Sequence, residues 1–207
     1  MIRLIIFDFA GTLAYPRQTD WAEFFAQLHD FSIRIGSEEQ KQRFLQMSLE
    51  LVSNSEGWND FTNRLVVKAG ATIEREERER LQDYLERKFG YKLYDDALEV
   101  LSLPQKKAIL TLASKFMVSS ISHLRDFEIF TPKEAGANKP DLKAFLAVLE
   151  KFQVDPQETV MVGDSLERDI LPAKAIGIKA ILLDRDGTDS NADCDKISSL
   201  KELKKFL

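Results

Sequence analysis

The 207-residue sequence has little of several features that mark special classes of protein. Its one cysteine, Cys194, can form no disulfide within the chain, which excludes a disulfide-stabilised scaffold. No apolar run reaches the roughly 18 residues that a membrane-spanning helix needs. Basic residues are not in excess, because 29 Lys and Arg stand against 34 Asp and Glu, for a net charge of −5. We therefore expect a cytoplasmic protein with neither a nucleic-acid nor a membrane partner.

What is present is an ordinary globular composition, with 44% hydrophobic and 30% charged residues and length for one or two domains. Residues 2–7 form an apolar run that leads directly into Asp8 and Gly11. The run is too short for the apolar region of a signal peptide. Because it is continuous rather than alternating, it predicts a strand buried on both faces of a parallel sheet.

Residues 16–92 predict four helices and no strand. Apolar residues at positions 21, 24, 25 and 28 have helical spacing. Ser37 followed by Gln40 is typical of a capping box at the start of a second helix. Apolar positions around 58–66 and 74–92 indicate the third and fourth helices.

After residue 95 the pattern alternates between helices and strands, with strands predicted at 108–112, 127–130, 159–162 and 178–183. Pro140 suits the first turn of one helix and Pro172 that of another, while 184–195 is a polar loop. This alternation predicts an α/β fold with a doubly wound parallel sheet. The expected organisation is a core of residues 1–15 and 94–207, with a four-helix domain of residues 16–93 inserted into it.

Polar residues stand where the predicted strands end, which is where ligands bind in such sheets. Asp8 ends the first strand, Thr111 the second, and Asp164 follows the strand at 159–162, with Asp169 five residues later. Lys139 precedes a predicted helix. Any one of these aspartates could be a turn former, but three carboxylates, a lysine and a hydroxyl at one sheet edge indicate a site.

These residues resemble, in order, the four motifs of the haloacid dehalogenase superfamily. The motifs are Asp8-x-Ala10-Gly11-Thr12-Leu13, Thr111, Lys139-Pro140 and Gly163-Asp164-Ser165 with Asp169. Ser119 is the alternative to Thr111 as the second motif. The resemblance implies a Rossmann-like core, and it implies that the helical insertion between the first and second motifs is a cap domain.

The resemblance also implies a Mg²⁺-dependent hydrolase acting on a small phosphorylated metabolite, as a monomer or homodimer. Asp8 would attack phosphorus and form an aspartyl-phosphate, which divides one difficult displacement into two steps. Asp8, Asp164 and the backbone carbonyl of Ala10 would bind Mg²⁺, with Asp169 in support, since Mg²⁺ prefers oxygen ligands.

The implied phosphate-binding groups are Lys139, the Thr111 hydroxyl and the backbone N–H groups of the turn that contains Gly11 and Thr12. Lys139 and Thr111 would be catalytic together with Asp8. These groups would neutralise and hold the phosphoryl oxygens in the transition state.

One departure from the family pattern is Ala10, where typical phosphatases of the superfamily carry an acid–base aspartate. Such general acid–base help is worth roughly 10²–10⁴-fold. Three hypotheses remain: a slow phosphatase, a phosphonoacetaldehyde hydrolase-like enzyme, and a non-catalytic domain that binds Mg²⁺ and phosphate. The second would need a cap lysine, and no recognisable motif surrounds Lys41, Lys68, Lys88 or Lys92. A haloacid dehalogenase needs no Mg²⁺ and is disfavoured by the paired Asp164 and Asp169.

Overall fold

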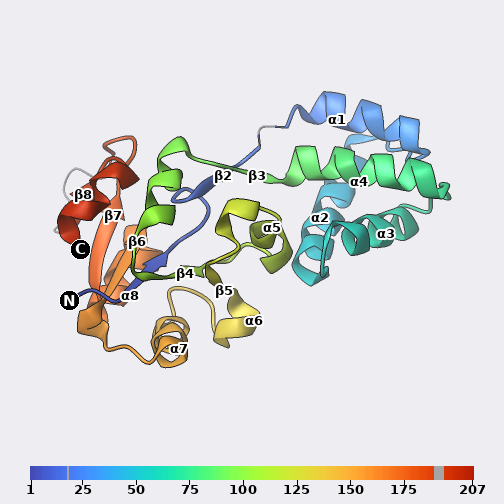
Figure 1. Cartoon of the computed structure of the whole chain (residues 1–207). Coiled ribbons are helices and arrows are strands. Elements are labelled where there is room, and N and C mark those ends of the chain that lie inside the picture. The colour runs from blue at the N-terminus through green and yellow to red at the C-terminus, as the bar shows by residue number, and fades with distance from the viewer. Residues whose placement is uncertain (18, 189–193) are drawn as a thin grey trace. The chain divides into compact units, whose positions relative to one another are not determined.

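The structure is a computed structural model that describes residues 1–17, 19–188 and 194–207. The chain divides into two compact units, one of Met1–Tyr15 with Lys92–Leu207 and the other of Pro16–Tyr91 (Figure 1). The first unit contains the large sheet and the second is helical. Among the described residues, no helix is both long and apolar enough to cross a membrane; the predicted cytoplasmic location stays a prediction.

The large sheet has six strands in the order β5-β4-β1-β6-β7-β8, and all its pairings are parallel. The strands are β1 Leu4–Phe7, β4 Lys106–Leu110, β5 Glu128–Phe130, β6 Thr159–Gly163, β7 Lys179–Leu183 and β8 Asp195–Ile197. Phe7 at the end of β1 pairs with Ile109 on one side and Val162 on the other. The doubly wound parallel sheet predicted from the sequence is confirmed.

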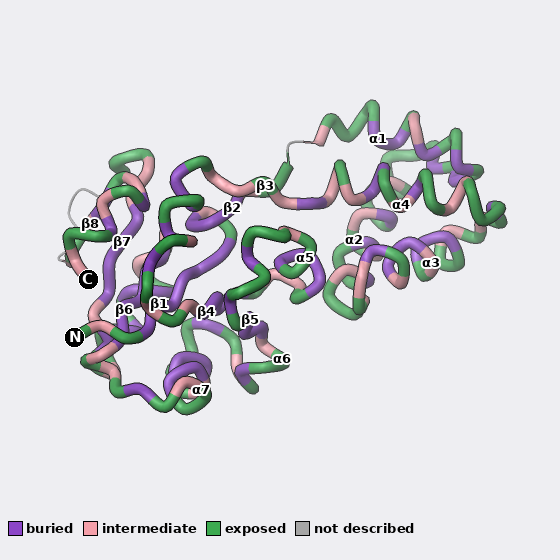
Figure 2. Tube along the Cα trace, in the orientation of Figure 1, coloured by how far each residue is buried: buried purple, intermediate pink, exposed green. Residues whose placement is uncertain are grey.

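Helical segments pack on both faces of this sheet, so its central strands are buried (Figure 2). The helices of this unit are α5 Lys115–Ser119, α6 Pro132–Ala135, α7 Leu142–Phe152 and α8 Leu171–Ala175. Shorter 3-10 helices are η2 Asp95–Ser102, η3 Ser122–Leu124, η4 Pro156–Glu158 and η6 Leu200–Phe206, and η5 Leu166–Ile170 is a π-helical turn. One face packs Leu4 and Ile6 of β1 against Phe145 of α7 and Ala173 of α8.

The helical unit contains the four predicted helices: α1 Trp21–Leu28, α2 Glu38–Asn54, α3 Trp58–Lys68 and α4 Arg75–Phe89, with a short 3-10 turn, η1 His29–Phe31, after α1. The predicted capping box opens α2, because Ser37 Oγ accepts from Gln40 N at 3.2 Å and the Gln40 side chain accepts from Ser37 N at 3.0 Å. The core of the unit is aromatic, and the ring of Phe24 stacks on that of Tyr84 at 5.7 Å.

The structure corrects the predicted elements at the ends of the helical unit. The sequence predicts no strand between residues 16 and 92, yet β2 Ala14–Pro16 pairs with β3 Tyr91–Leu93 in a two-stranded sheet. Three residues are too few to show the alternation that reveals a strand. The predicted polar loop at 184–195 also ends in a strand, β8, although residues 189–193 of that loop lie outside the described residues.

The prediction that Pro140 lies in the first turn of a helix is wrong. Helix α7 begins at Leu142, and Asp141 is its N-cap, with Oδ1 accepting from Lys143 N at 2.9 Å. An aspartate side chain satisfies a free N–H group at the helix start, which proline cannot do. The start of α7 therefore shifts past Pro140, and residues 139 and 140 lie in the turn before it. Pro172, by contrast, lies in the first turn of α8 as predicted.

Candidate functional site

Three neighbouring strands of the sheet end in the polar residues that the sequence singles out. Asp8 directly follows β1, Thr111 follows β4 and Asp164 follows β6. Because β1 lies between β4 and β6 and all three run parallel, these residues share one edge of the sheet. Asp8 N donates to Val162 O at 2.9 Å, so the sheet itself fixes the backbone that carries the Asp8 side chain.

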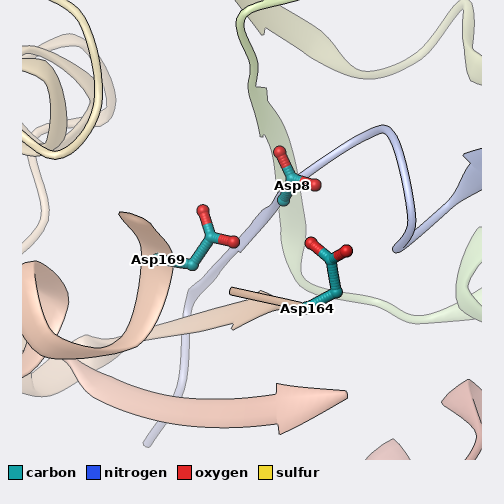
Figure 3. Close-up of side chains that lie close together, drawn as sticks. All are labelled: Asp8, Asp164 and Asp169. Carbon is teal, nitrogen blue, oxygen red and sulfur yellow. The ribbon is translucent and has the colours of Figure 1, made fainter. Parts of the chain in front are cut away.

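A third carboxylate reaches the same place from the turn after β6. Asp169 lies in η5 and is 1% exposed. One carboxylate oxygen each of Asp8, Asp164 and Asp169 lies within 4.8 Å of the others, and the three side chains converge in Figure 3. Gly163 permits this approach, because a Cβ there would lie 2.5 Å from the Asp169 side chain. The three aspartates that the sequence singles out therefore lie together in the structure.

Lys139 bridges two of these carboxylates from the turn before α7. Its Nζ donates to Asp8 Oδ1 and to Asp169 Oδ1, at 2.6 Å in each case, and its side chain is only 4% exposed. Burial alone would lower the pKa of Lys139, but the charges of Asp8 and Asp169 outweigh burial and raise it. Lys139 is therefore a buried ammonium ion that a carboxylate holds on each side.

The single charge of Lys139 does not balance three carboxylates, and the pKa values of Asp164 and Asp169 are raised. Burial, followed by the charge of Asp8, raises the pKa of Asp164. Burial is also the largest cause that raises the pKa of Asp169 to about 6, against the opposing effect of Lys139. The site therefore has less positive charge than its carboxylates need.

The same carboxylates offer free ligand atoms. Asp164 Oδ1 is buried and has no hydrogen-bond partner among the described residues. A buried, unpaired carboxylate oxygen is costly unless a cation or donor satisfies it. Clustered carboxylate oxygens with a deficit of positive charge fit a hard divalent cation such as Mg²⁺.

The turn after Asp8 packs directly against the carboxylates. Gly11 has a φ of +95°, and a Cβ there would lie 2.1 Å from Asp164 Oδ2, so any other residue would be strained and would displace the Asp164 side chain. Gly11 N donates to Ala14 O at 2.8 Å, which closes the turn. Thr12 is fully buried, and its Oγ1 has no partner within the part of the chain that the structure describes. Ala10 is exposed and supplies only a methyl group beside Asp8.

The two candidates for the second motif differ in position. Thr111 is 3% exposed at the end of β4, and its Oγ1 accepts from Ala113 N at 3.0 Å. Its hydroxyl proton is not used by that bond. Ser119 is the last residue of α5 and is exposed.

Sequence reasoning missed one residue that contacts this site. Arg185 donates from Nη2 to Thr12 O at 2.8 Å and from Nε to Gly11 O at 3.3 Å. Arg185 lies two residues after the end of β7, the neighbour of β6. Inspecting the polar residues that follow the predicted strand at 178–183, in the same way as those after the other strands, would have found it.

The fold and the site together define an α/β protein with a carboxylate–lysine centre at the carboxyl edge of its parallel sheet. The chain belongs to the haloacid dehalogenase-like hydrolase family, whose model matches residues 2–177.

Curated relatives include phosphatases. A glyceraldehyde 3-phosphate phosphatase of Methanothermobacter thermautotrophicus is 33% identical over 100 residues, covering 43% of this chain and 44% of the relative. A phosphoserine phosphatase of Thermus thermophilus is 29% identical over 128 residues, covering 57% of this chain and 51% of the relative. The matches thus span about half the length of these relatives.

Solved structures resemble the chain over nearly its whole length. A phosphatase of this superfamily from Thermococcus onnurineus has a TM-score of 0.64 at 27% identity and covers 99% of this chain and 97% of its own. A 2-haloacid dehalogenase from Pseudomonas syringae has the same TM-score and the same coverage of both chains at 21% identity, which shows the shared fold alone.

Proposed function

We propose that the protein is a Mg²⁺-dependent phosphatase that forms an aspartyl-phosphate on Asp8. The observation that carries the proposal is the convergence of Asp8, Asp164 and Asp169 within 4.8 Å, with Lys139 Nζ 2.6 Å from two of them. The phosphatase names of the two curated relatives support it. Phosphoryl transfer depends chiefly on positioning and charge neutralisation, and these residues supply both.

Asp8 is the nucleophile of the proposed reaction. A carboxylate oxygen of Asp8 forms a bond to phosphorus while the bond from phosphorus to the leaving alcohol oxygen breaks with its electron pair. Water then attacks the same phosphorus, the bond to Asp8 breaks, and inorganic phosphate leaves. Lys139 orients the Asp8 carboxylate before the first step, because it donates to Asp8 Oδ1 at 2.6 Å.

The proposed metal ligands are Asp8, Asp164 and the backbone carbonyl of Ala10, with Asp169 in a supporting place. Bound Mg²⁺ supplies positive charge that neutralises the phosphoryl oxygens. Asp169 fixes Lys139 through its Oδ1 and accepts from Ser165 N through its Oδ2 at 3.2 Å. Thr111 and Lys139 are the proposed phosphoryl-oxygen donors. The turn at Gly11 and Thr12, which the sequence also suggests, is less suited, because the Gly11 N–H already donates to Ala14 O at 2.8 Å and Thr12 is fully buried.

Ala10 gives the proposed reaction an unusual rate profile. Without a carboxyl at this position, the leaving alkoxide takes its proton from water, and the water that attacks the phosphoenzyme has no base. An activated leaving group needs no acid, so the first step is affected less than the second. We therefore expect a burst followed by slow turnover with p-nitrophenyl phosphate or acetyl phosphate.

The proposed substrate is a small phosphorylated metabolite, and the helical unit is the proposed cap that selects it. No observation favours phosphonate cleavage. Among the lysines of the helical unit, Lys41 pairs with Glu38 and Lys88 pairs with Glu23, and both lysines are half-buried, while Lys68 is exposed.

The test is a screen of phosphate esters and phosphonates with the purified protein, with Mg²⁺ and then with a chelator. We expect ester hydrolysis that needs Mg²⁺ and that Asp164→Asn abolishes. Asp195→Asn is the control, since it removes the same charge from a half-exposed side chain on the edge strand β8. Absence of turnover on every compound, with Mg²⁺ and phosphate still bound in calorimetry, would refute the enzyme and favour the non-catalytic hypothesis.

A further inference from the structure

Two crossings of the chain, one after Tyr15 and one after Tyr91, join the helical unit to the unit that contains the large sheet. Strands β2 and β3 lie at these crossings and pair with each other. We call residues 13–17 and 90–94 the connecting ribbon. Since no other stretch of backbone links the two units, any movement between them has to bend this ribbon or the residues next to it.

The core end of the connecting ribbon, at Leu13 and Tyr94, contacts an arginine of the large sheet. Tyr94 N donates to Leu13 O at 3.0 Å, which closes this end of the ribbon. The guanidinium of Arg185, two residues after β7, lies 3.8 Å from the centre of the Tyr94 ring. The ring of Tyr15 lies 4.8 Å from that of Tyr94. Both strands of the ribbon therefore contribute to one stack that ends on Arg185.

The same guanidinium binds the backbone before the ribbon and a side chain after it. It donates to the carbonyl oxygens of Gly11 and Thr12, at 3.3 and 2.8 Å. It also makes two bonds to Asp96, from Nη1 to Oδ2 at 2.9 Å and from Nη2 to Oδ1 at 3.0 Å. The planar fork of arginine suits such paired bonds. Arg185 thus ties the residues that enter the ribbon to those that leave it.

Asp96 is itself held firmly, which makes it a fixed anchor for Arg185. Its Oδ2 accepts from Ser199 Oγ at 2.8 Å and from Leu200 N at 2.9 Å, so Asp96 in η2 is tied to the start of η6. Burial would raise the pKa of Asp96, but the hydrogen bonds from Arg185, Leu200 and Ser199 together lower it. The side chains of Asp96 and Arg185 are only 10% and 20% exposed, so water screens their attraction weakly.

The opposite end of the connecting ribbon is held by bonds of another kind. Arg17 N donates to Gly90 O at 3.0 Å, and beyond it Thr19 Oγ1 donates to Lys88 O at 2.7 Å. Each of these bonds joins one crossing to the other, and neither reaches the large sheet. The two ends are thus closed by backbone bonds of equal length, and the contacts of Arg185 belong to the core end alone.

We propose that Arg185 is a clamp that holds the core end of the connecting ribbon on the large sheet, so that movement between the two units bends the ribbon at its opposite end, near Arg17 and Gly90. The clamp keeps this bending away from the turn after Asp8, which packs against the Asp164 carboxylate. The inference concerns the motion of the chain and does not rest on the proposed function.

Amide hydrogen exchange of the wild type shows where the ribbon opens, because a bonded amide exchanges when its segment opens locally. The amides of Tyr94 and Arg17 are matched probes, since each donates to the other crossing over 3.0 Å. Hydrogen bonds to a charged group typically change a local equilibrium by about 10-fold to 100-fold. We therefore expect the protection factor of Tyr94 to exceed that of Arg17 by about this ratio.

Arg185→Gln removes the charge and the planar fork, and it should bring the ratio of the two protection factors close to that of an unclamped ribbon, about 1. Arg185→Lys keeps the charge without the fork and should recover part of the ratio. Val148→Ala is the control for general destabilisation, because Val148 is fully buried in α7 and the change leaves every contact of Arg185 in place. It should keep the wild-type ratio.

The outcomes decide the proposal whether or not each variant folds. A wild type in which Arg17 is protected as well as Tyr94 overturns the clamp without any variant. An Arg185→Gln that keeps the wild-type ratio overturns it, and so does a Val148→Ala that lowers the ratio as much. If Arg185→Gln does not fold, a wild-type ratio in Arg185→Lys overturns it. None of these measurements involves turnover, so failure of the proposed function would leave them unaffected.

Discussion

Removal of Lys139 should destabilise the protein strongly and in a way that depends on pH. Its Nζ lies 2.6 Å from both Asp8 Oδ1 and Asp169 Oδ1, and its side chain is 4% exposed. Lys139→Met keeps most of the volume of the side chain and removes the charge. The carboxylates are then left buried without their partner, a change that typically costs about 3–5 kcal/mol.

Protonation limits that cost and gives it its pH dependence. A carboxyl that is buried without a partner takes up a proton instead of staying charged. Its ordinary pKa is 3.8. Holding it protonated at pH 7 costs about 4 kcal/mol at 1.36 kcal/mol per unit, and about 2 kcal/mol at pH 5.5. The folded pKa of the carboxyls in the variant lies above the unfolded value, so the variant loses stability relative to the wild type as the pH rises from 5.5 to 7.

The wild type gives the reference for this comparison. The pKa of Lys139 is raised in the folded protein, so its contribution is fully present below the ordinary lysine value of 10.5 and is lost only as the pH rises through the folded pKa. Lys139 itself therefore adds no pH dependence between 5.5 and 7. The pKa of Asp169 is already raised to about 6 in the wild type, so the wild type also loses stability up to about pH 6, and the difference between the two proteins should grow mainly between pH 6 and 7.

The assay is urea unfolding of both proteins at pH 5.5 and pH 7, followed by circular dichroism. Lys115→Met is the control, because Lys115 pairs with Glu134 at 3.2 Å but is 53% exposed. An exposed pair of this kind should contribute under about 1 kcal/mol. A Lys139→Met variant that loses less than about 1 kcal/mol at pH 7, or loses the same amount at both pH values, would refute the reasoning.

Three further predictions test other parts of the site. Ala10→Asp should raise steady-state hydrolysis of p-nitrophenyl phosphate by roughly 10²-fold, and an unchanged rate would contradict the explanation of slow turnover. Gly11→Ala should lower the melting temperature more than Gly70→Ala, because both have positive φ, +95° and +67°, but only the Cβ at Gly11 meets Asp164; equal shifts would refute the close approach. The pKa of Asp96 is lowered on folding, so its contribution is present above the ordinary value of 3.8 and is lost as the pH falls through the folded pKa. The stability difference between the wild type and Asp96→Asn should therefore shrink below about pH 4, and a constant difference in acid unfolding would argue against the ion pair.

Much of the site could be predicted from the sequence because its residues come directly after predicted strands. An unbroken apolar run such as β1 marks a buried parallel strand, and the residue after it must lie at the carboxyl edge of the sheet. That rule placed Asp8 and Asp164 together without any knowledge of contacts.

Other parts could not be predicted because they depend on contacts distant in sequence. Spacing alone does not reveal that Asp96 and Arg185 meet across 89 positions. The predicted start of α7 was wrong because it relied on the preference of proline for the first turn and ignored the capping side chain of Asp141. Pairing of the three-residue strands β2 and β3 likewise depends on a partner that local sequence does not specify.

The most direct test of the account is to find the phosphoryl group on Asp8. The protein is mixed with acetyl phosphate and Mg²⁺, quenched in acid within the burst and digested with trypsin, which cleaves after Arg3 and Arg17. The account predicts that the peptide of residues 4–17 gains the mass of one phosphoryl group in the wild type and in Ala10→Asp, and gains none in Asp8→Asn. Turnover with no phosphoryl group on this peptide, or a phosphorylated peptide that persists in Asp8→Asn, would contradict the central claim.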